Sequence, residues 1–285
     1  MINNRPKVSI GMPVYNAEKY LRESLDSLVS QTFIDFELII SDNASSDGSS
    51  DICVEYSKKD KRISYFRQPI NISGWENFRY VLNEAKGDYF MWSAANDLRS
   101  LDFVELNFNF LSLNPEYVAS TSPNIQEGDN EEKDKVINFA LKQNDNFQRY
   151  VFFFDHCWQS HGIFYSLIRL SELKECPLLR DGSEFLGVDW GVNLFLASKG
   201  KINRTIMGKT IFGNNGTSQK PNFLKNIRTS YIEFYFPFYK LNMYVFDLIK
   251  PLSLIKRVRV MLILLSLNVR FNFDRFKAQL KQFLR

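Results

Sequence analysis

The sequence is poor in the residues on which several enzyme classes depend. It contains only two histidines, His156 and His161, and three cysteines without a CxxC pair, so a histidine-rich metal site and a zinc-binding cysteine cluster are both excluded. No GxGxxG or GxxxxGK[ST] loop occurs, which excludes the phosphate loops of dinucleotide-binding dehydrogenases and P-loop NTPases. No GxSxG elbow is present either. Chemistry in this chain must therefore rest on carboxylates, alone or with a hard cation held by oxygen ligands.

Long apolar runs are also missing. No stretch reaches the roughly 18 apolar residues that cross a bilayer, and the first ten residues, MINNRPKVSI, lack the apolar core of an export signal. An odd number of cysteines without a pairing pattern is typical of reduced thiols in the cytoplasm. We therefore expect a cytoplasmic protein, with peripheral attachment to the inner face of the cell membrane as an additional expectation.

The positive charge of the chain is concentrated at its end. The formal net charge is +4, but residues 240–285 alone hold ten Lys or Arg against two acidic residues. From about residue 222 the chain becomes aromatic, basic and apolar, which suits a helix lying in the headgroup layer of an anionic membrane surface. The alternative is an all-helical subdomain packed on the body or on a second subunit, in a homodimer. We expect no nucleic acid partner.

The rest of the chain alternates between strand and helix patterns. Val8–Met12 and Phe36–Ile40 are short apolar runs typical of buried strands, and between them Ala17–Val29 carries one apolar stripe at helical spacing, with Asn16 placed as its cap. The same patterns predict strands at 63–67, 88–93, 161–167 and 202–212, and helices at 75–85, 101–113, 147–154 and 188–197. This alternation predicts an α/β fold with a mostly parallel sheet between helices.

Polar side chains follow the first two predicted strands. Tyr15 and Asn16 come after the first strand, and Asp42 follows the second. Ligands of open α/β sheets bind at the carboxyl ends of the strands, so the sequence predicts a binding edge there.

Two segments together resemble a known family. PVYNAEKYLRESLDSLVSQTFIDFELIISDNASSDGS and NISGWENFRYVLNEAKGDYFMWSAAND are similar to the nucleotide-binding half of the family-2, inverting, nucleotide-sugar glycosyltransferases of bacterial polysaccharide and O-antigen assembly. The resemblance implies a GT-A fold over residues 1–221, with a nucleotide-binding half at about 7–115 and an acceptor half at about 116–221. Residues 222–285 would form a helical C-terminal region.

The resemblance assigns the donor site to residues in the first half. Pro13 and Tyr15 would line the base pocket, and Asp42 would accept hydrogen bonds from the base or ribose, unless it only forms an Asx turn. An arginine suits a diphosphate because its planar fork forms two charge-assisted hydrogen bonds. The residues expected to bind the nucleotide sugar are Pro13, Tyr15, Asn16, Asp42, Asn71, Arg79 and Asn96.

The metal motif of the family is incomplete here. Aligning GDYFMWSAAND on the family pattern GxYxxxLDxDD places Ala94 and Asn96 where aspartates are usual and retains only Asp97. The resemblance makes Asp97 the ligand of Mn²⁺ or Mg²⁺, with the diphosphate supplying further oxygens. The alternative is that Asp97 merely caps the helix predicted near Leu101.

The candidate base lies in the second half. Val188-Asp189-Trp190 resembles the place where the family has an acidic pair, which makes Asp189 the candidate general base. Asp181 and Glu184 are the rival candidates, and capping of a helix is the alternative role for Asp189.

These inferences combine into one expected activity. The chain would transfer a sugar from a nucleoside-diphosphate donor, UDP or dTDP, to a hydroxyl of a glycan or a lipid-linked glycan, with inversion. The alternatives are a non-catalytic nucleotide-sugar-binding subunit on the same fold, favoured by Ala94 and Asn96, and an interaction module whose functional part is the basic tail.

Overall fold

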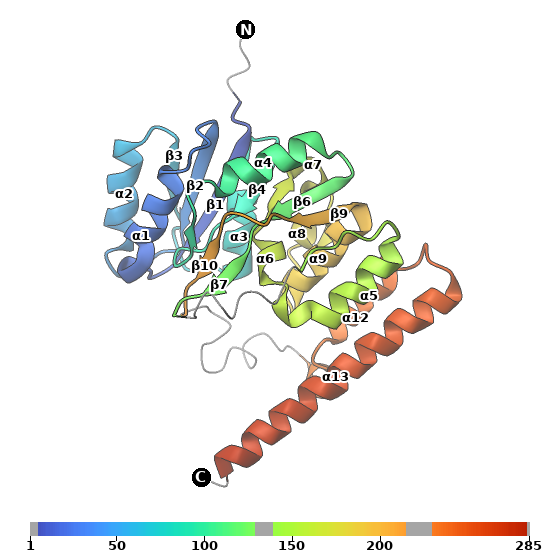
Figure 1. Cartoon of the computed structure of the whole chain (residues 1–285). Coiled ribbons are helices and arrows are strands. Elements are labelled where there is room, and N and C mark those ends of the chain that lie inside the picture. The colour runs from blue at the N-terminus through green and yellow to red at the C-terminus, as the bar shows by residue number, and fades with distance from the viewer. Residues whose placement is uncertain (1–4, 129–138, 215–229, 284–285) are drawn as a thin grey trace.

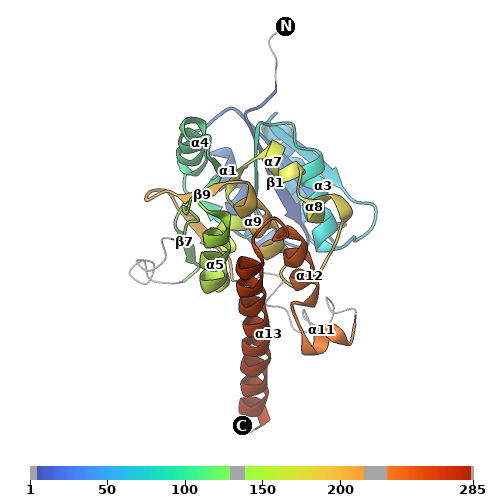
Figure 2. The same ribbon diagram turned by 90° about the vertical axis from the view of Figure 1, so that its right-hand side faces the viewer.

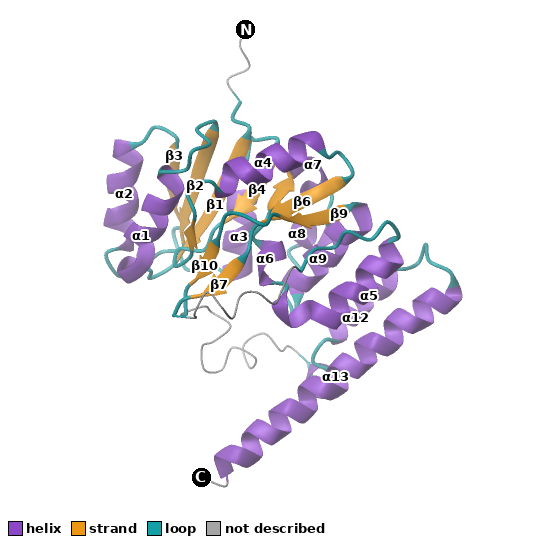
Figure 3. Ribbon diagram, viewed as in Figure 1, coloured by secondary structure: helices purple, strands orange, loops and turns teal. Residues whose placement is uncertain are grey.

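The computed structural model describes residues 5–128, 139–214 and 230–283. A central sheet is covered by helices on both faces, and the long helix α13 (Leu254–Phe283) extends away from this body (Figures 1 and 2). Figure 3 shows how strands and helices alternate through the body, whereas the C-terminal part is helical. The predicted α/β fold with a C-terminal helical region is confirmed.

The first predicted unit forms as expected from its pattern. β1 (Val8–Val14), α1 (Glu18–Val29) and β2 (Phe36–Asp42) follow one another, and β1 pairs with β2 in parallel so that Val14 lies opposite Asp42. This register brings the loop after β1 beside the loop after β2, at one edge of the sheet.

The other elements extend the sheet and cover its faces. In the first half they are α2 (Ser49–Lys59), β3 (Ile63–Arg67), α3 (Gly74–Asn83), β4 (Tyr89–Trp92), β5 (Leu98–Arg99), α4 (Phe103–Leu113), β6 (Tyr117–Thr121) and β7 (Asn124–Gln126). In the second half they are α5 (Asn146–His156), η2 (Cys157–Gln159), α6 (His161–Phe164), β8 (Leu167–Arg169), α7 (Leu170–Lys174), α8 (Pro177–Asp181), α9 (Val188–Lys199), β9 (Lys201–Arg204) and β10 (Thr210–Phe212).

The main sheet is mostly parallel. Its strand order is β3-β2-β1-β4-β8-β6-β9, and only β8 runs antiparallel to its neighbours. A smaller sheet of order β5-β10-β7 lies beside it, so that β10 connects the loop after β4 with the second half of the chain.

The strand predicted over 161–167 is wrong. Residues His161–Phe164 form the short helix α6, and strand β8 begins only at Leu167. Ile163 and Phe164 made the run look like a strand because both are apolar. In the structure both are buried as part of a helix, since α6 packs on α9 and β6. Burial alone does not distinguish a short helix from a strand in so short a run.

Two apolar cores occupy the two faces of the sheet. Ile10 and Met12 of β1 point into a core that also contains residues of α1, α2 and α4. Alternate strand positions point to the opposite face, where Phe90 and Trp92 of β4 lie in a larger core with α3, α5 and α9. Helices α12 and α13 contribute to this second core, so the C-terminal helices are packed on the body.

Gly11 lies where β1 and α3 approach each other closely. A Cβ at this position would come within 2.7 Å of Val81 Cγ2 and 2.8 Å of Phe90 Cζ. Because overpacking a core costs about 1–3 kcal/mol, we expect Gly11→Ala to lower the free energy of unfolding by that amount in urea. Gly74→Ala is the matched control, since a Cβ there has no atom within 4 Å. An equal loss for both variants would contradict the packing argument.

The C-terminal region consists of three described helices, α11 (Ile232–Tyr235), α12 (Tyr239–Leu248) and α13. The backbone N–H of Phe238, just before α12, donates to Asn268 Oδ1 of α13 at 2.9 Å, and α12 and α13 also pack on α9 and α5. Within the described residues, no helix has both the length and the apolar character needed to span a bilayer.

Candidate functional site

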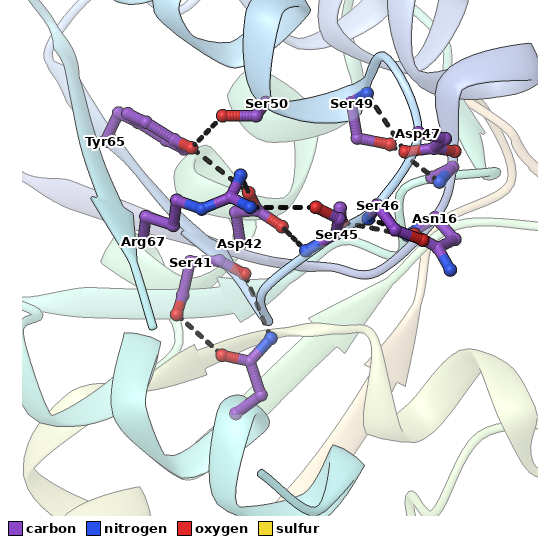
Figure 4. A network of polar contacts seen from close by, with 12 residues as sticks. Asn16, Ser41, Asp42, Ser45, Ser46, Asp47, Ser49, Ser50, Tyr65 and Arg67 are labelled. Carbon is purple, nitrogen blue, oxygen red and sulfur yellow. Dashed lines mark hydrogen bonds and ion pairs between the residues drawn. The ribbon is translucent and has the colours of Figure 1, made fainter. Parts of the chain in front are cut away.

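The loops after β1 and β2 are tied together by hydrogen bonds (Figure 4). Asn16 Oδ1 accepts from the backbone N–H of Ser46 at 2.8 Å, and the N–H of Asn16 donates to Ser45 Oγ at 2.9 Å. The prediction that Asn16 caps α1 is wrong, because the N-cap position is Ala17, and the N–H of Glu18 at the start of the helix donates to Asp47 Oδ2 at 3.1 Å. Asn16, with a φ of 47°, instead shapes the loop at the binding edge.

Asp42 lies at the centre of this network and is fully buried. Its Oδ1 accepts from the N–H of Ser45 at 2.9 Å, and its Oδ2 accepts from Tyr65 Oη at 3.1 Å and Arg67 Nη1 at 2.8 Å. Sequence reasoning missed Tyr65 and Arg67. The available signal was their place at alternate positions of β3, whose pairing sets Arg67 opposite Asp42.

Tyr15 is exposed in the loop after β1, and Pro13 is half-buried at the end of that strand. Asn71 is exposed just before α3, in a loop held by Asn43, whose side chain exchanges two 2.8 Å hydrogen bonds with the backbone of Ile72. These placements put Tyr15, Asn71 and the Asp42 network around the same edge of the sheet. The nucleotide contacts expected of them remain predictions.

Arg79 has a structural role that the sequence did not reveal. Its Nε donates to the carbonyl of Leu179 at 2.6 Å and its Nη2 to the carbonyl of Arg180 at 2.8 Å. These hydrogen bonds tie α3 to α8, which ends at Asp181 and is followed by the segment containing Glu184. A contact between Arg79 and a diphosphate remains a prediction.

Asp97 lies in the turn between β4 and β5, with only 4% of its surface exposed. Ser24 of α1 anchors this turn by donating to the carbonyl of Asp97 at 2.8 Å, and half-buried Asn96 lies in the same turn. Asp97 Oδ1 accepts from the N–H of Gly213 at 3.2 Å, whereas its buried Oδ2 has no hydrogen-bond donor among the described residues. Helix α4 has Asp102 at its N-cap position, so the alternative that Asp97 caps this helix is wrong.

Arg99 is a buried charge beside Asp97 that sequence reasoning missed. Its side chain is 4% exposed, none of its three guanidinium nitrogens has a hydrogen-bond partner among the described residues, and it lies over the ring of Phe103. Burial raises the pKa of Asp97 to about 6, and the charges of Arg99 and His161 and the Gly213 hydrogen bond oppose that rise.

Asp189 lies in the first turn of α9, two residues after the N-cap Gly187, and it is not the cap of that helix. Burial raises its pKa above the ordinary value, and the charge of His161 lowers it. The charge of His161 therefore acts on both Asp97 and Asp189. The pKa of Tyr165 is raised by its burial and then by the charges of the same two carboxylates.

The structure thus brings Asp97 and Asp189, 92 positions apart in the sequence, close enough for the charge of His161 to act on both and for both to raise the pKa of Tyr165. The rival candidates Asp181 and Glu184 are exposed in the segment before α9. Two carboxylates with raised pKa values beside a binding edge are typical of a reacting centre.

Comparison with known proteins identifies the family. The sequence profile described as "Glycosyl transferase family 2" matches residues 9–169, more than half of the chain. The chain belongs to glycosyl transferase family 2.

Relatives in the family match parts of this chain. "Glycosyltransferase GlyA" of Streptococcus pneumoniae serotype 4 is 28% identical over 174 residues, which are 61% of this chain and 23% of GlyA. An uncharacterized glycosyltransferase of Haemophilus influenzae is 37% identical over 111 residues, 39% of this chain and 44% of the relative. The chain therefore spans less than half the length of these curated relatives.

A solved structure supports the fold of this family-2 chain. Crystalline S. aureus TarS in complex with UDP-GlcNAc superposes with a TM-score of 0.67 at 16% identity, covering 90% of this chain and 70% of that one. At this level of identity the likeness concerns the fold, which is the GT-A fold expected from the resemblance.

Family-2 enzymes of this fold commonly use a divalent cation, and Asp97 fits such an ion. No group of three or more His, Cys, Asp or Glu side chains gathers as a ready-made metal site in the described part of the chain. Magnesium is, however, usually held by one or two carboxylates together with substrate phosphates. The buried Asp97 Oδ2, which has no donor in the described structure, is a free oxygen of the required kind.

The raised pKa of Asp97 predicts how the stability of the metal-free protein depends on pH. Since its pKa rises from 3.8 to about 6 on folding, the folded chain keeps a proton that the unfolded chain releases. The stability that the folded chain gains from keeping this proton is fully present below about pH 4. It is lost as the pH rises toward about 6, at up to about 1.4 kcal/mol per pH unit. Asp97→Asn keeps the neutral shape, so it should match the wild type in urea unfolding at about pH 4 and exceed it at about pH 7. An equal difference at both pH values would contradict the raised pKa.

Proposed function

We propose that this family-2 chain transfers a sugar from a nucleoside-diphosphate donor to a hydroxyl group, with inversion at the anomeric carbon. The observation that carries the proposal is that two carboxylates with raised pKa values, Asp97 and Asp189, both lie within electrostatic reach of His161 and Tyr165. A single displacement needs two groups, one that stabilises the departing diphosphate and one that takes the acceptor proton.

Asp189 acts as the general base. Its carboxylate accepts the proton of the acceptor hydroxyl as that oxygen attacks the anomeric carbon, and the bond to the diphosphate oxygen breaks on the opposite side. A base with a raised pKa suits this step because catalysis is most effective when the pKa lies near the working pH. Its position in the first turn of α9, whose residues pack in the core, keeps the carboxylate in place.

The donor is bound at the edge formed by the loops after β1, β2 and β4. Pro13, Tyr15 and the Asp42 network hold the base and ribose, with Asn16, Asn71 and Asn96 nearby, and Arg79 reaches the diphosphate. Asp97 would hold Mn²⁺ or Mg²⁺, an ion that supplies positive charge to the phosphate oxygens. UDP or dTDP is the expected nucleotide, and TarS, which shares the fold, has been crystallised with UDP-GlcNAc.

The acceptor is a hydroxyl of a glycan or of a lipid-linked glycan, as in bacterial polysaccharide or O-antigen assembly. Such an acceptor lies at the cytoplasmic face of the membrane, so the protein works as a peripheral enzyme there, through residues 240–285. A homodimer through the same region is the competing arrangement.

Calorimetric titration with UDP, dTDP and GDP, first with Mn²⁺ and then with EDTA, tests the donor site. Binding of one nucleotide that depends on Mn²⁺ would support the proposal, including the role of Asp97. Binding that is unchanged by EDTA would remove the metal ion from the proposed mechanism. Failure of all three nucleotides to bind a folded sample would overturn the donor-site assignment.

A non-catalytic nucleotide-sugar-binding subunit is the second candidate, because Ala94 and Asn96 replace two carboxylates of the family motif. Hydrolysis of the bound nucleotide sugar separates the two. A transferase slowly releases the nucleoside diphosphate with water as acceptor, and Asp189→Asn suppresses that release. A binding subunit gives no release with either chain.

A further inference from the structure

Helix α13 carries an apolar surface that faces away from the protein. Along its exposed side, apolar residues recur every three or four positions, which places them on one side of a helix. We call these residues the α13 stripe: Leu254, Val258, Leu262, Leu265, Val269 and Phe273. Each is between 48 and 72% exposed.

The opposite side of α13 packs against the body of the protein. Val260, Leu264 and Leu267 are buried in the same core as α5, α9 and α12. Asn268 is buried too and bonds to the backbone N–H of Phe238. The buried side is sufficient to hold α13 on the body. The α13 stripe therefore makes no contribution to that packing. In Figure 1 the helix extends well beyond that body.

Basic side chains border the stripe on both sides. Between residues 254 and 273 the helix has four Lys or Arg and no acidic residue. Arg259 and Arg270 each follow a stripe residue by one position, about 100° around the helix, and both are exposed. Arg257 precedes Val258 and lies on the other border, against the ring of Phe246.

Helix α11 continues this surface beside the second half of α13. Asn272 Nδ2 donates to the carbonyl of Tyr235 at 2.6 Å, which fixes the two helices side by side. Tyr231, Phe234 and Tyr235 are 92, 57 and 68% exposed. Tyrosine is enriched at the boundary between lipid headgroups and acyl chains, and phenylalanine is common on the apolar face of helices that lie there.

We propose that the α13 stripe and the α11 aromatics dock on an anionic lipid surface. Charge complementarity favours lipid over a second copy of this chain. Helices paired through the stripe would bring arginine borders together without an acidic residue between positions 254 and 273 to offset them. Lipid phosphates offset those charges, and acyl chains accept the apolar side chains.

Docking in this way places the acceptor side of the site close to the membrane, a consequence that rests on the proposed function. Trp190, which follows Asp189, packs against Trp158 with ring centroids 5.0 Å apart. Trp158 in turn is stacked with Phe271 of α13, 6.1 Å between centroids. A lipid-linked acceptor would then reach Asp189 without leaving the surface.

Sedimentation with phosphatidylcholine vesicles, with and without phosphatidylglycerol, tests the proposal on the full chain. We expect binding only when phosphatidylglycerol is present, and a loss of about tenfold or more in affinity for Leu262→Glu/Leu265→Glu, because two exposed leucines no longer enter the lipid. Ile34→Glu/Leu113→Glu is the matched control, because these two aliphatic side chains are also exposed, at 76 and 80%, but lie outside the α13 stripe. This control should bind as the wild type does.

The basic borders need a separate comparison. Arg259→Gln/Arg270→Gln should weaken binding to the phosphatidylglycerol vesicles and make it less sensitive to salt. Lys58→Gln/Lys61→Gln removes the same charge from exposed positions at the end of α2, which lies on the side of the body away from α13 (Figure 1), and should have no effect.

Three results would overturn the docking proposal. They are equal binding to neutral vesicles, unchanged binding of the stripe variant, and a dimer that the stripe variant dissociates while neither chain binds vesicles. Titration of the same variants with UDP and Mn²⁺ keeps the two proposals apart. Loss of vesicle binding with intact UDP binding concerns the stripe alone, and loss of UDP binding in every chain concerns the donor site alone.

Discussion

Asp189→Asn is expected to lower kcat by about 10²- to 10⁴-fold, the range typical for loss of a general base. The amide has nearly the shape of the carboxylate but cannot accept the acceptor proton. Nucleotide affinity should be unchanged, because Asp189 lies in the acceptor half and not in the loops after β1 and β2. Sugar transfer measured under single turnover, together with calorimetric titration of the nucleotide, checks both statements.

The control variants are Asp181→Asn and Glu184→Gln, which change the two rival carboxylates in the segment before α9. Both are exposed, so neither change should disturb folding, and both variants should retain transfer. A wild-type rate for Asp189→Asn with a loss in either control would move the base to that residue. The wild-type rate should also fall at low pH, as Asp189 becomes protonated, at a higher pH than for an ordinary aspartate.

Asp97→Asn is expected to remove most of the effect of Mn²⁺ on nucleotide binding. The variant replaces the one carboxylate retained from the family motif by a neutral amide, although the amide oxygen keeps its position. We expect metal-dependent UDP affinity to fall by at least about 10- to 100-fold, the loss typical when even an outer partner of a metal ligand is removed. Titration with UDP at fixed Mn²⁺, repeated with EDTA, measures this difference.

Asp102→Asn provides the matched control for Asp97. Asp102 is a nearby carboxylate on the same segment, but it accepts a hydrogen bond from Ser100 at the start of α4 and lies outside the site. Its variant should keep the full effect of Mn²⁺. If Asp97→Asn also keeps that effect, Asp97 is not the metal ligand, and the buried Arg99 becomes the candidate for the positive charge of the site.

The C-terminal helices show how far composition alone can lead. The excess of basic and aromatic residues after about residue 222 indicated a surface partner, but it left open which side of which helix meets that partner. In the part of α13 whose side chains are described, the buried residues leave one apolar side exposed, which carries the α13 stripe. This choice depends on where α5, α9 and α12 lie and is invisible in the composition.

The sequence alone was enough to predict most of the strands and helices through residue 113, though not the two-residue strand β5, and it also carried the family resemblance. Those features rest on local periodicity and on motifs whose residues are close in the chain. It failed at Asn16 and at 161–167, where contacts with distant segments override the local preference. Asn16 bonds to the Ser46 N–H, and residues 161–164 pack on α9. Neither contact can be predicted from residues that are close in the sequence.

The assembly of the site depends on contacts between distant segments of the chain. Arg67 reaches Asp42 because β3 pairs with β2, and Gly213 reaches Asp97 because β10 pairs with β5. The charge of His161 acts on Asp189 because α6, which begins at His161, packs on α9. A linear pattern specifies which side chains are available, whereas burial, pKa and the pairing of charges depend on chain segments that meet only after folding.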